Sequence, residues 1–149
     1  MRVALVTGGG TGIGRSAALE LNKIDFTVYV IGRRDEELIK TSSLATNNNH
    51  KIIPIKTDIT VGSQVIALFD KIKSDHGRID LLFNNAGMGA PRVPIEDLKE
   101  EDWRKTVDVN LTGSFLCSQQ AIKLMKIQSP QGGRIVNNGS VSAHSPRPD

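Results

Sequence analysis

The sequence of 149 residues is poor in cysteine and in long apolar runs. A single cysteine, Cys117, excludes an intrachain disulfide and a cysteine-rich zinc site, and it indicates a reducing compartment in which this side chain serves for packing. No apolar run nears the roughly 20 residues that span a bilayer, and a strand-like segment begins at once where a signal peptide would have a longer apolar region. We therefore expect a cytoplasmic protein with no membrane partner and no bound metal.

An excess of charge of one sign is also missing. Lysine and arginine number 19 against 16 for aspartate and glutamate, a formal charge of +3 that is spread along the chain without a basic block. This distribution argues against a nucleic-acid partner and suits a small anionic ligand. No shift in composition marks a second domain, so residues 1–149 are expected to form one domain that buries roughly two thirds of its unfolded surface.

Short apolar runs alternate with longer segments along the chain. The runs cover residues 3–6, 27–31, 51–55, 79–83 and 134–136, and they are typical of buried strands. Strands that alternate with helices imply crossover connections and a parallel sheet. The expected fold class is therefore α/β, with a doubly wound parallel sheet.

Two helices can be given a buried face from their apolar spacing. A helix over residues 12–22 is expected to turn four side chains toward the sheet, namely Ile13, Ala17, Leu21 and Ile24. A later helix, which Gly77 is placed to end, carries apolar residues at i, i+3, i+4 and i+7, namely Val65, Leu68, Phe69 and Ile72.

Glycines follow the first apolar run directly, where a helix is expected to begin. Residues 7–14 read T-G-G-G-T-G-I-G. Such a turn lets the backbone approach a pyrophosphate closely, and the new helix directs its free N–H groups and positive dipole end at the anion. A plain surface turn is the alternative, because a glycine cluster alone is a weak signal.

Two arginines follow the second strand. In an NAD site an acidic residue near this position binds the ribose 2′-hydroxyl, whereas here Gly32 is followed by Arg33 and Arg34. Cations at a helix start oppose the dipole by a few tenths of a kcal/mol, so a bound anion explains their placement better. We expect that anion to be a 2′-phosphate, with solvated arginines balanced by the acidic residues at 35–37 as the alternative.

Polar residues also follow the third and fourth strands. Asp58 is placed to accept a hydrogen bond from an adenine amino group, or else to cap a turn or helix. The sequence N-N-A-G at residues 84–87 comes at the carboxyl edge of the sheet, where open α/β sheets bind ligands, although an ordinary turn would look the same.

Two further polar residues are candidates for chemistry. Asn110 lies in an apolar stripe of a helix over residues 101–126, together with Trp103, Val107, Leu111 and Ser114. A buried amide without partners costs roughly 1–3 kcal/mol, so Asn110 must bond to backbone, water or a catalytic neighbour, or serve structure alone. Ser140 follows the fifth strand and could donate to a substrate carbonyl. The preceding Asn138-Gly139 is a hairpin signal, but little in the following residues could pair as a return strand.

The glycine turn, Asp58, the N-N-A-G sequence, Asn110 and Ser140 follow one another in the order found in the short-chain dehydrogenase/reductase family. The chain resembles that family over nearly its whole length. The resemblance implies a Rossmann fold, with Asn110 and Ser140 as catalytic residues and Asp58 as the adenine contact. The residues expected to bind the cofactor are Thr7, Gly8, Gly10, Thr11, Gly12, Ile13, Gly14, Arg33, Arg34, Asp58, Ile59, Asn85, Ala86 and Gly87.

By this resemblance the protein is an oxidoreductase that transfers hydride between a nicotinamide and a small carbonyl or alcohol substrate. Gly32 followed by Arg33 is similar to the NADP-preferring form, whereas Thr11 stands where many such members have another basic residue and Gly139 replaces a common serine. NADP is therefore expected in preference to NAD.

The family's Tyr-x-x-x-Lys pair is missing, since the only tyrosine, Tyr29, lies in the second strand. We expect the intact molecule to be longer and the 149 residues alone to be inactive. The alternative is a non-catalytic protein that binds the dinucleotide.

The resemblance also implies a homodimer or homotetramer. Members of the family commonly pair the helix that corresponds to residues 101–126 here across a two-fold axis. Five small residues of this helix would let the backbones of two copies approach closely, unless they only pack on the sheet: Gly113, Ser114, Cys117, Ser118 and Ala121.

Overall fold

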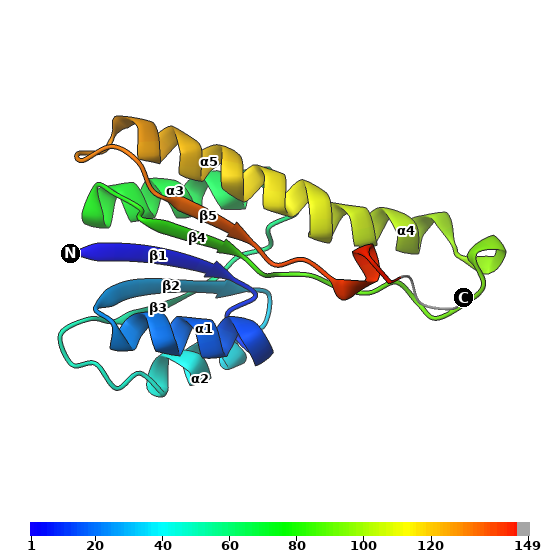
Figure 1. The fold of residues 1–149 in the computed structure, drawn as a ribbon, viewed down its shortest axis with the longest axis horizontal. Helices are drawn as coiled ribbons and strands as arrows, with labels where there is room; N and C mark the ends of the chain where they lie inside the picture. The colour runs from blue at the N-terminus through cyan, green and yellow to red at the C-terminus, as the bar shows by residue number, and fades with distance from the viewer. Residues whose placement is uncertain (146–149) are drawn as a thin grey trace.

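A computed structural model describes residues 1–145. All five strands run parallel in one sheet with the order β3-β2-β1-β4-β5 (Figure 1). The strands are β1 (Arg2–Thr7), β2 (Phe26–Gly32), β3 (Ile52–Lys56), β4 (Leu81–Asn84) and β5 (Arg134–Asn137). The predicted α/β class with a doubly wound parallel sheet is confirmed, and each predicted strand is present within two residues of its expected bounds.

Helices cover both faces of the sheet (Figure 1). One core packs α1 (Gly12–Lys23) and α2 (Asp35–Ser43) against the strands, and the other packs α3 (Gly62–His76) and α5 (Gly113–Ile127) on the opposite face. Because the inner strands are covered on both sides, residues 3–6 and 28–31 are fully buried and read as continuous apolar runs.

The order in which strands are added to the sheet reverses at β1, which has β2 on one side and β4 on the other. The strands before β4 are added in one direction and the later strands in the other. In open α/β sheets this reversal leaves a crevice at the carboxyl ends of the strands, and ligands bind there.

The prediction for the buried face of α1 is wrong at both ends of the helix, although Leu21 packs half-buried against the core as predicted. Ile13 and Ile24 are 64% and 56% exposed, whereas Gly14, Ala18 and Asn22 are buried. These three lie four residues apart and form a narrow face of small or hydrogen-bonded side chains. The apolar pattern therefore pointed to a neighbouring face of the helix.

Close packing and hydrogen bonding explain this choice of face. A Cβ atom at Gly14 would lie 2.3 Å from the Gly8 carbonyl oxygen, so this part of α1 rests directly on the glycine turn. The buried Asn22 amide donates to the carbonyl oxygens of Phe26 (3.3 Å) and His50 (2.9 Å), which offsets the cost of burying it.

The predicted face of α3 is confirmed. Its buried side chains are the four that the spacing predicted, Val65, Leu68, Phe69 and Ile72. The helix ends at Gly77, whose positive φ of 68° closes the last turn in the left-handed conformation that glycine adopts without strain. The C-terminal signal in the sequence was therefore correct.

The predicted long helix is interrupted. It consists of α4 (Glu100–Val107), the π-helical segment η2 (Asp108–Thr112) and α5, which together form a rod that projects beyond the sheet (Figure 1). The short 3-10 turns η1 (Ile95–Asp97) and η3 (Val141–Ala143) lie near this projecting end. The predicted apolar stripe is not buried, since Trp103 and Leu111 are 58% and 67% exposed.

The small residues of α5 face the interior. Cys117 and Ala121 are fully buried in the core beside α3, and a Cβ atom at Gly113 would lie 2.5 Å from Ile59 Cδ1. The suggestion that these three residues meet a second copy of the chain is therefore wrong. Burial also raises the pKa of the Cys117 thiol to about 12, which agrees with the predicted packing role.

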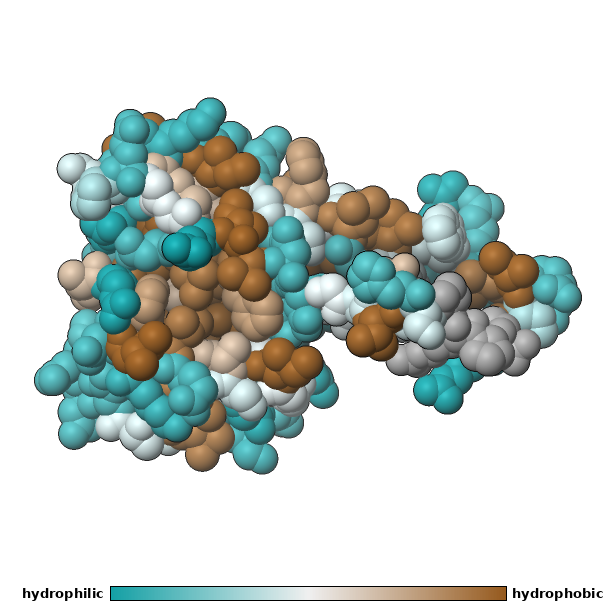
Figure 2. All heavy atoms as spheres, viewed as in Figure 1, coloured by the Kyte–Doolittle hydropathy of each residue, from teal (hydrophilic) through white to brown (hydrophobic). Residues whose placement is uncertain are grey.

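Among residues 1–145, no helix combines the length and the apolar character that crossing a bilayer requires. Figure 2 shows a mixed polar and apolar surface, with apolar residues also on the projecting part of the molecule.

Candidate functional site

Thr7 joins the turns that follow β1 and β4. Its hydroxyl oxygen accepts hydrogen bonds from the backbone N–H groups of Asn85 and Ala86, both at 2.9 Å. The Asn85 amide in turn donates to the Thr7 carbonyl oxygen at 3.0 Å. The two turns are therefore held together at the point where the strand order reverses.

The glycines leave room beside this junction. Gly8 has a φ of +65°, and a Cβ atom there would lie 3.0 Å from Ala86 Cα. Gly12, with a φ of +53°, has nothing within 4 Å of the same position. Thr11 precedes α1 without a side-chain cap, so the N–H groups of the first turn stay available to an anion.

A pocket of about 430 Å³ opens at the carboxyl ends of the first four strands. The predicted residues that line it are Gly8, Gly10, Thr11, Arg33, Arg34, Asp58, Ile59, Asn85, Ala86 and Gly87. Four predicted residues lie outside this lining. Thr7 is buried beneath it, Gly12 and Gly14 belong to the start of α1, and Ile13 points to solvent.

Arg33 and Arg34, which follow β2, line this pocket. In the part of the chain that the structure describes, neither Arg33 nor Arg34 forms an ion pair, and Arg34 donates to the Thr11 hydroxyl at 3.3 Å. Of the acidic residues that follow, Glu37 pairs with Arg15 instead. Both arginines are exposed and form no direct ion pair with residues 35–37 in the described part of the chain, so solvated arginines stay the alternative to a bound anion.

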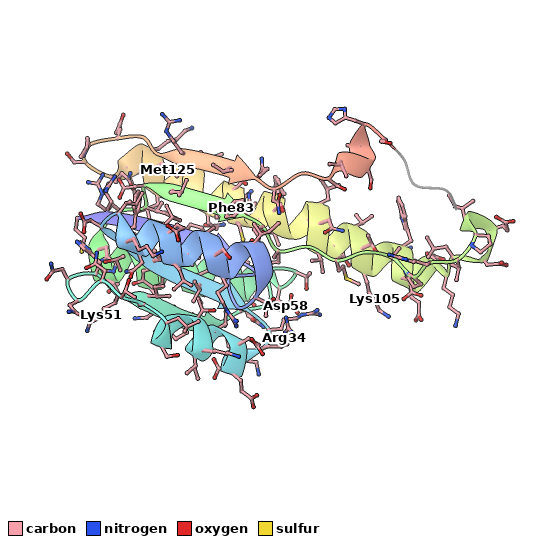
Figure 3. All side chains as sticks on the ribbon, turned by 60° about the horizontal axis from the view of Figure 1, so that its bottom comes forward. Arg34, Lys51, Asp58, Phe83, Lys105 and Met125 are labelled. Atoms are coloured by element: carbon pink, nitrogen blue, oxygen red, sulfur yellow. The ribbon has the colours of Figure 1, made fainter. Side chains whose placement is uncertain are left out.

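Asp58 faces the arginines from the turn after β3. Figure 3 shows Arg34 and Asp58 close to each other where the sheet ends, and both line the pocket. Burial acts to raise the pKa of Asp58, but hydrogen bonds from the Thr60 N–H and hydroxyl, with the charge of Arg33, outweigh burial and lower this pKa. Asp58 thus caps its own turn, as the alternative proposed, while its ionised carboxylate stays at the pocket wall.

A second pocket of about 710 Å³ adjoins the first. Both pockets are lined by the turn at residues 85–87, and the second also includes Asn110 and Ser140. The two catalytic candidates, from η2 and from the end of β5, are therefore brought to one cavity although 30 positions separate them in the sequence.

Asn110 is exposed, but its amide is held at both ends. Its Oδ1 accepts from the Met88 N–H at 3.0 Å, and its Nδ2 donates to the Met88 carbonyl oxygen at 2.8 Å. The amide thus has backbone partners, although Asn110 is not buried as the apolar stripe predicted. One N–H and one lone pair of the amide remain for further partners.

Ser140 lies on the segment that leaves β5 at the ligand edge. Its hydroxyl accepts from the Ser142 N–H at 3.2 Å, which leaves the hydroxyl proton free to donate. No return strand follows β5 among residues 1–145, so the hairpin suggested by Asn138-Gly139 does not form.

Sequence reasoning did not select several residues that line the pockets. In the first they are Ile31, Gly32, Glu37, Leu38, Thr57 and Val109. In the second, Asn137 is the last residue of β5 and Asn138 follows it, and Asn138 donates to Asn85 Oδ1 at 3.1 Å. The end of an apolar run was the available signal for both asparagines. Within residues 1–145, no group of acidic, histidine or cysteine side chains is placed to hold a metal ion.

The one tyrosine is not part of this site. Tyr29 is fully buried in β2, and its hydroxyl donates to Asp75 Oδ2 at 2.5 Å. Burial, with this hydrogen bond and the charge of Asp75, raises the pKa of Tyr29 above its usual range. Tyr29 therefore cannot act as an acid or base in either pocket.

The family model described as short chain dehydrogenase matches residues 2–149. The chain belongs to the short-chain dehydrogenase/reductase family. One member, a 3beta-hydroxysteroid dehydrogenase of Mediterraneibacter gnavus, is 35% identical over 141 residues, which cover 95% of this chain and 50% of that protein.

Solved structures of other short-chain dehydrogenases/reductases have the same fold. NAD+-bound xylitol dehydrogenase matches with a TM-score of 0.91 at 30% identity, covering 99% of this chain and 56% of that one. A metagenomic short-chain oxidoreductase in complex with NADP gives a TM-score of 0.85 at 27% identity, covering 91% of this chain and 61% of that one. The chain spans about half the length of the curated relatives it matches, between 50% and 58% for the first three.

Proposed function

We propose that this chain forms the cofactor-binding part of an NADP-dependent oxidoreductase that acts on a small carbonyl or alcohol substrate. The observation that carries the proposal is the position of Arg33 and Arg34, which line the first pocket without an ion-pair partner among the described residues. A 2′-phosphate would give these arginines a direct anionic partner.

The other residues of the first pocket fit a dinucleotide. The open face at Gly12 and the uncapped start of α1 suit a pyrophosphate, which the backbone N–H groups would hold. Asp58 is placed to accept from an adenine amino group, and Asn85 to Gly87 connect this pocket to the second. Gly32 stands where an acidic residue would favour the 2′-hydroxyl of NAD.

In the second pocket we assign Ser140 to the substrate oxygen. When bound, NADPH would supply a hydride to the carbonyl carbon, and NADP+ would accept one from the alcohol carbon. The Ser140 hydroxyl donates a hydrogen bond to the oxygen, where negative charge develops as a carbonyl is reduced. Asn110, held by Met88, orients the water or side chain through which a proton reaches the site.

Among the described residues, the lining of the second pocket contains no titratable side chain that could serve as the proton donor. The family's Tyr-x-x-x-Lys pair does not occur in residues 1–149. A positioned proton donor contributes roughly 10²- to 10⁴-fold to the rate. We therefore assign the catalytic activity to the whole protein, and we expect residues 1–149 alone to bind the dinucleotide without turning over carbonyl substrates.

The test is the affinity of the whole protein for NADPH and NADH, measured by titration calorimetry. We expect NADPH to bind more tightly by about 1.5–3 kcal/mol, because Arg33 makes charge-assisted hydrogen bonds to the 2′-phosphate. Arg33→Ala should narrow this difference. Lys40→Ala, which removes a cation from α2 outside the pocket, should leave it unchanged. Equal affinities in the parent protein would refute the NADP assignment.

A further inference from the structure

Glu37 brings a carboxylate to the wall of the first pocket. It lies in the first turn of α2, and its Cβ is 3.0 Å from the position that a Cβ atom on Gly10 would occupy. It therefore lies against the glycine turn, in the same pocket lining as Arg33 and Arg34. An unpaired carboxylate at this place would repel a phosphate group.

Arg15 neutralises this carboxylate from α1. Its Nη2 donates to Glu37 Oε2 at 2.6 Å, and the two side chains are only 20% and 34% exposed. The same guanidinium donates to the Thr41 hydroxyl (Nε, 3.0 Å) and to the Gly10 carbonyl oxygen. Bonds from two nitrogens fix the guanidinium beside the glycine turn, so the ion pair has a defined geometry.

We propose that Arg15 determines the preference for a 2′-phosphorylated dinucleotide by cancelling the charge of Glu37. The inference rests on the proposed NADP function of the pocket. It adds Arg15, which would act on the dinucleotide through Glu37. Arg15 is a positioning residue, since it does not line the pocket itself.

An effect of charge can be separated from an effect on loop position. The glycine turn has a second support, because the buried Thr41 hydroxyl lies 3.0 Å from the Gly9 carbonyl oxygen. A displaced turn would weaken NADPH and NADH alike, since both have the pyrophosphate. An unpaired Glu37 carboxylate repels the pyrophosphate of both dinucleotides, but it weakens NADPH more, because only NADPH adds the 2′-phosphate.

The experiment compares Arg15→Met with the double variant Arg15→Met/Glu37→Gln in the whole protein. Calorimetric titration with NADPH and with NADH gives the NADPH/NADH affinity ratio of the parent protein and of each variant. We expect Arg15→Met to lower the NADPH/NADH affinity ratio by roughly tenfold, because an unpaired carboxylate then lines the partly solvated pocket that would hold the 2′-phosphate. High salt should reduce this loss.

The double variant should restore the ratio, because it removes the unpaired carboxylate without replacing the guanidinium. Lys23→Met serves as the matched control, since it removes a cation from α1 that pairs with the exposed Glu20. The NADPH/NADH affinity ratio of Lys23→Met should equal that of the parent protein.

The outcomes separate the two proposals. If the parent prefers NADPH and Arg15→Met keeps that preference, the role of Arg15 is refuted while the NADP function stands. If the ratio falls but Glu37→Gln fails to restore it, the unpaired carboxylate is not the cause and the charge argument is wrong. If NADPH and NADH weaken equally, Arg15 acts by holding the turn and its role in the preference is refuted. If the parent itself binds NADPH and NADH equally, the proposed function fails and the inference fails with it.

Discussion

Ser140 and Asn110 share a pocket but are held differently. The Asn110 amide is fixed by two hydrogen bonds to the Met88 backbone, which suits a group that orients its neighbours. The Ser140 hydroxyl accepts one bond from the Ser142 N–H and keeps its proton to donate. Of the two, Ser140 is therefore the group whose hydrogen bond can strengthen as charge develops on a substrate oxygen.

Replacing Ser140 by alanine should lower kcat of the whole protein by roughly 100-fold, the usual loss when one donor to a developing oxyanion is removed. The affinity for NADPH should not change, because Ser140 lines only the second pocket. Steady-state kinetics and calorimetry measure both quantities. Ser142→Ala is the control and should retain activity, since its contact to Ser140 comes from the backbone. The reverse result for the two serines would refute the assignment.

Each helix is placed by the residues that it buries. Helix α1 lies close to the turn after β1 because Gly14 has no side chain, and α5 lies close to Ile59 because Gly113 has none. The π-helical segment η2 separates α4 from α5 and carries Asn110. Such segments frequently occur at functional sites, and this one turns the amide toward the Met88 backbone.

Gly14→Ala tests the packing of α1 on the glycine turn. The added methyl group would meet the Gly8 carbonyl oxygen at 2.3 Å, so helix or turn must move. We expect a loss of about 1–3 kcal/mol in the free energy of unfolding, measured with urea, together with weaker dinucleotide binding.

The matched control is Gly62→Ala at the start of α3. No atom lies within 4 Å of its added Cβ, and alanine reduces the freedom of the unfolded chain. This variant should be neutral or slightly more stable. A Gly14→Ala protein as stable as the parent would contradict the close approach of helix and turn.

Asp80 directly precedes β4 and links it to β1 and β5 at the amino ends of the strands, opposite the pockets. Its carboxylate accepts from the Val3 N–H at 2.8 Å and pairs with Arg78 at 2.6 Å. Its backbone N–H donates to the Val3 carbonyl oxygen, and its carbonyl oxygen accepts from the Arg134 N–H. Burial alone would raise the pKa of Asp80, but the hydrogen bonds from Arg78 and Val3 outweigh burial and lower this pKa.

This lowered pKa predicts a dependence of stability on pH. Since the folded-state pKa of Asp80 lies below the unfolded value of about 3.9, its stabilisation is fully present above that value. The stabilisation is lost as the pH falls through the folded-state pKa. Asp80→Asn should lower the free energy of unfolding by about 1–3 kcal/mol at pH 7 and by less in acid, measured by urea unfolding. The exposed Asp70→Asn should show neither effect, and an unchanged acid response in Asp80→Asn would contradict the prediction.

The projecting rod leaves large apolar side chains in solvent. Trp103, Leu111, Phe115 and Ile122 are 58%, 67%, 57% and 45% exposed. A series of this kind on one rod is typical of a contact surface. We propose that this rod mediates the expected self-association, through these large residues and not through the buried small ones.

Phe115→Lys should therefore reduce the mass of the whole protein in light scattering to that of a smaller species, because a charge would be buried in the contact. Ile39→Lys is the control, since Ile39 is 53% exposed on α2, away from the rod. A parent protein that is monomeric at working concentration would refute the proposal.

The fold class, the strands and the buried face of α3 could be predicted because they depend on local patterns. Continuous apolar runs identify strands that are covered on both faces, and the 3.6-residue period identifies the buried side of α3. The glycine turn and Ser140 could be found for a related reason. Parallel strands bring their carboxyl ends to one edge, so residues that follow apolar runs must gather there.

The face of α1, the partners of Asn110 and the neutralisation of Glu37 come from the packed structure. In α1 the apolar pattern pointed to Ile13, but close contact required the smaller face with Gly14. Glu37 meets Arg15 across 22 positions of sequence, and Asn85 meets Thr7 across 78. Local periodicity determines which way a side chain leaves its own element. Which group it then meets depends on how distant elements pack, since steric fit and hydrogen bonding select one arrangement among those that the pattern allows.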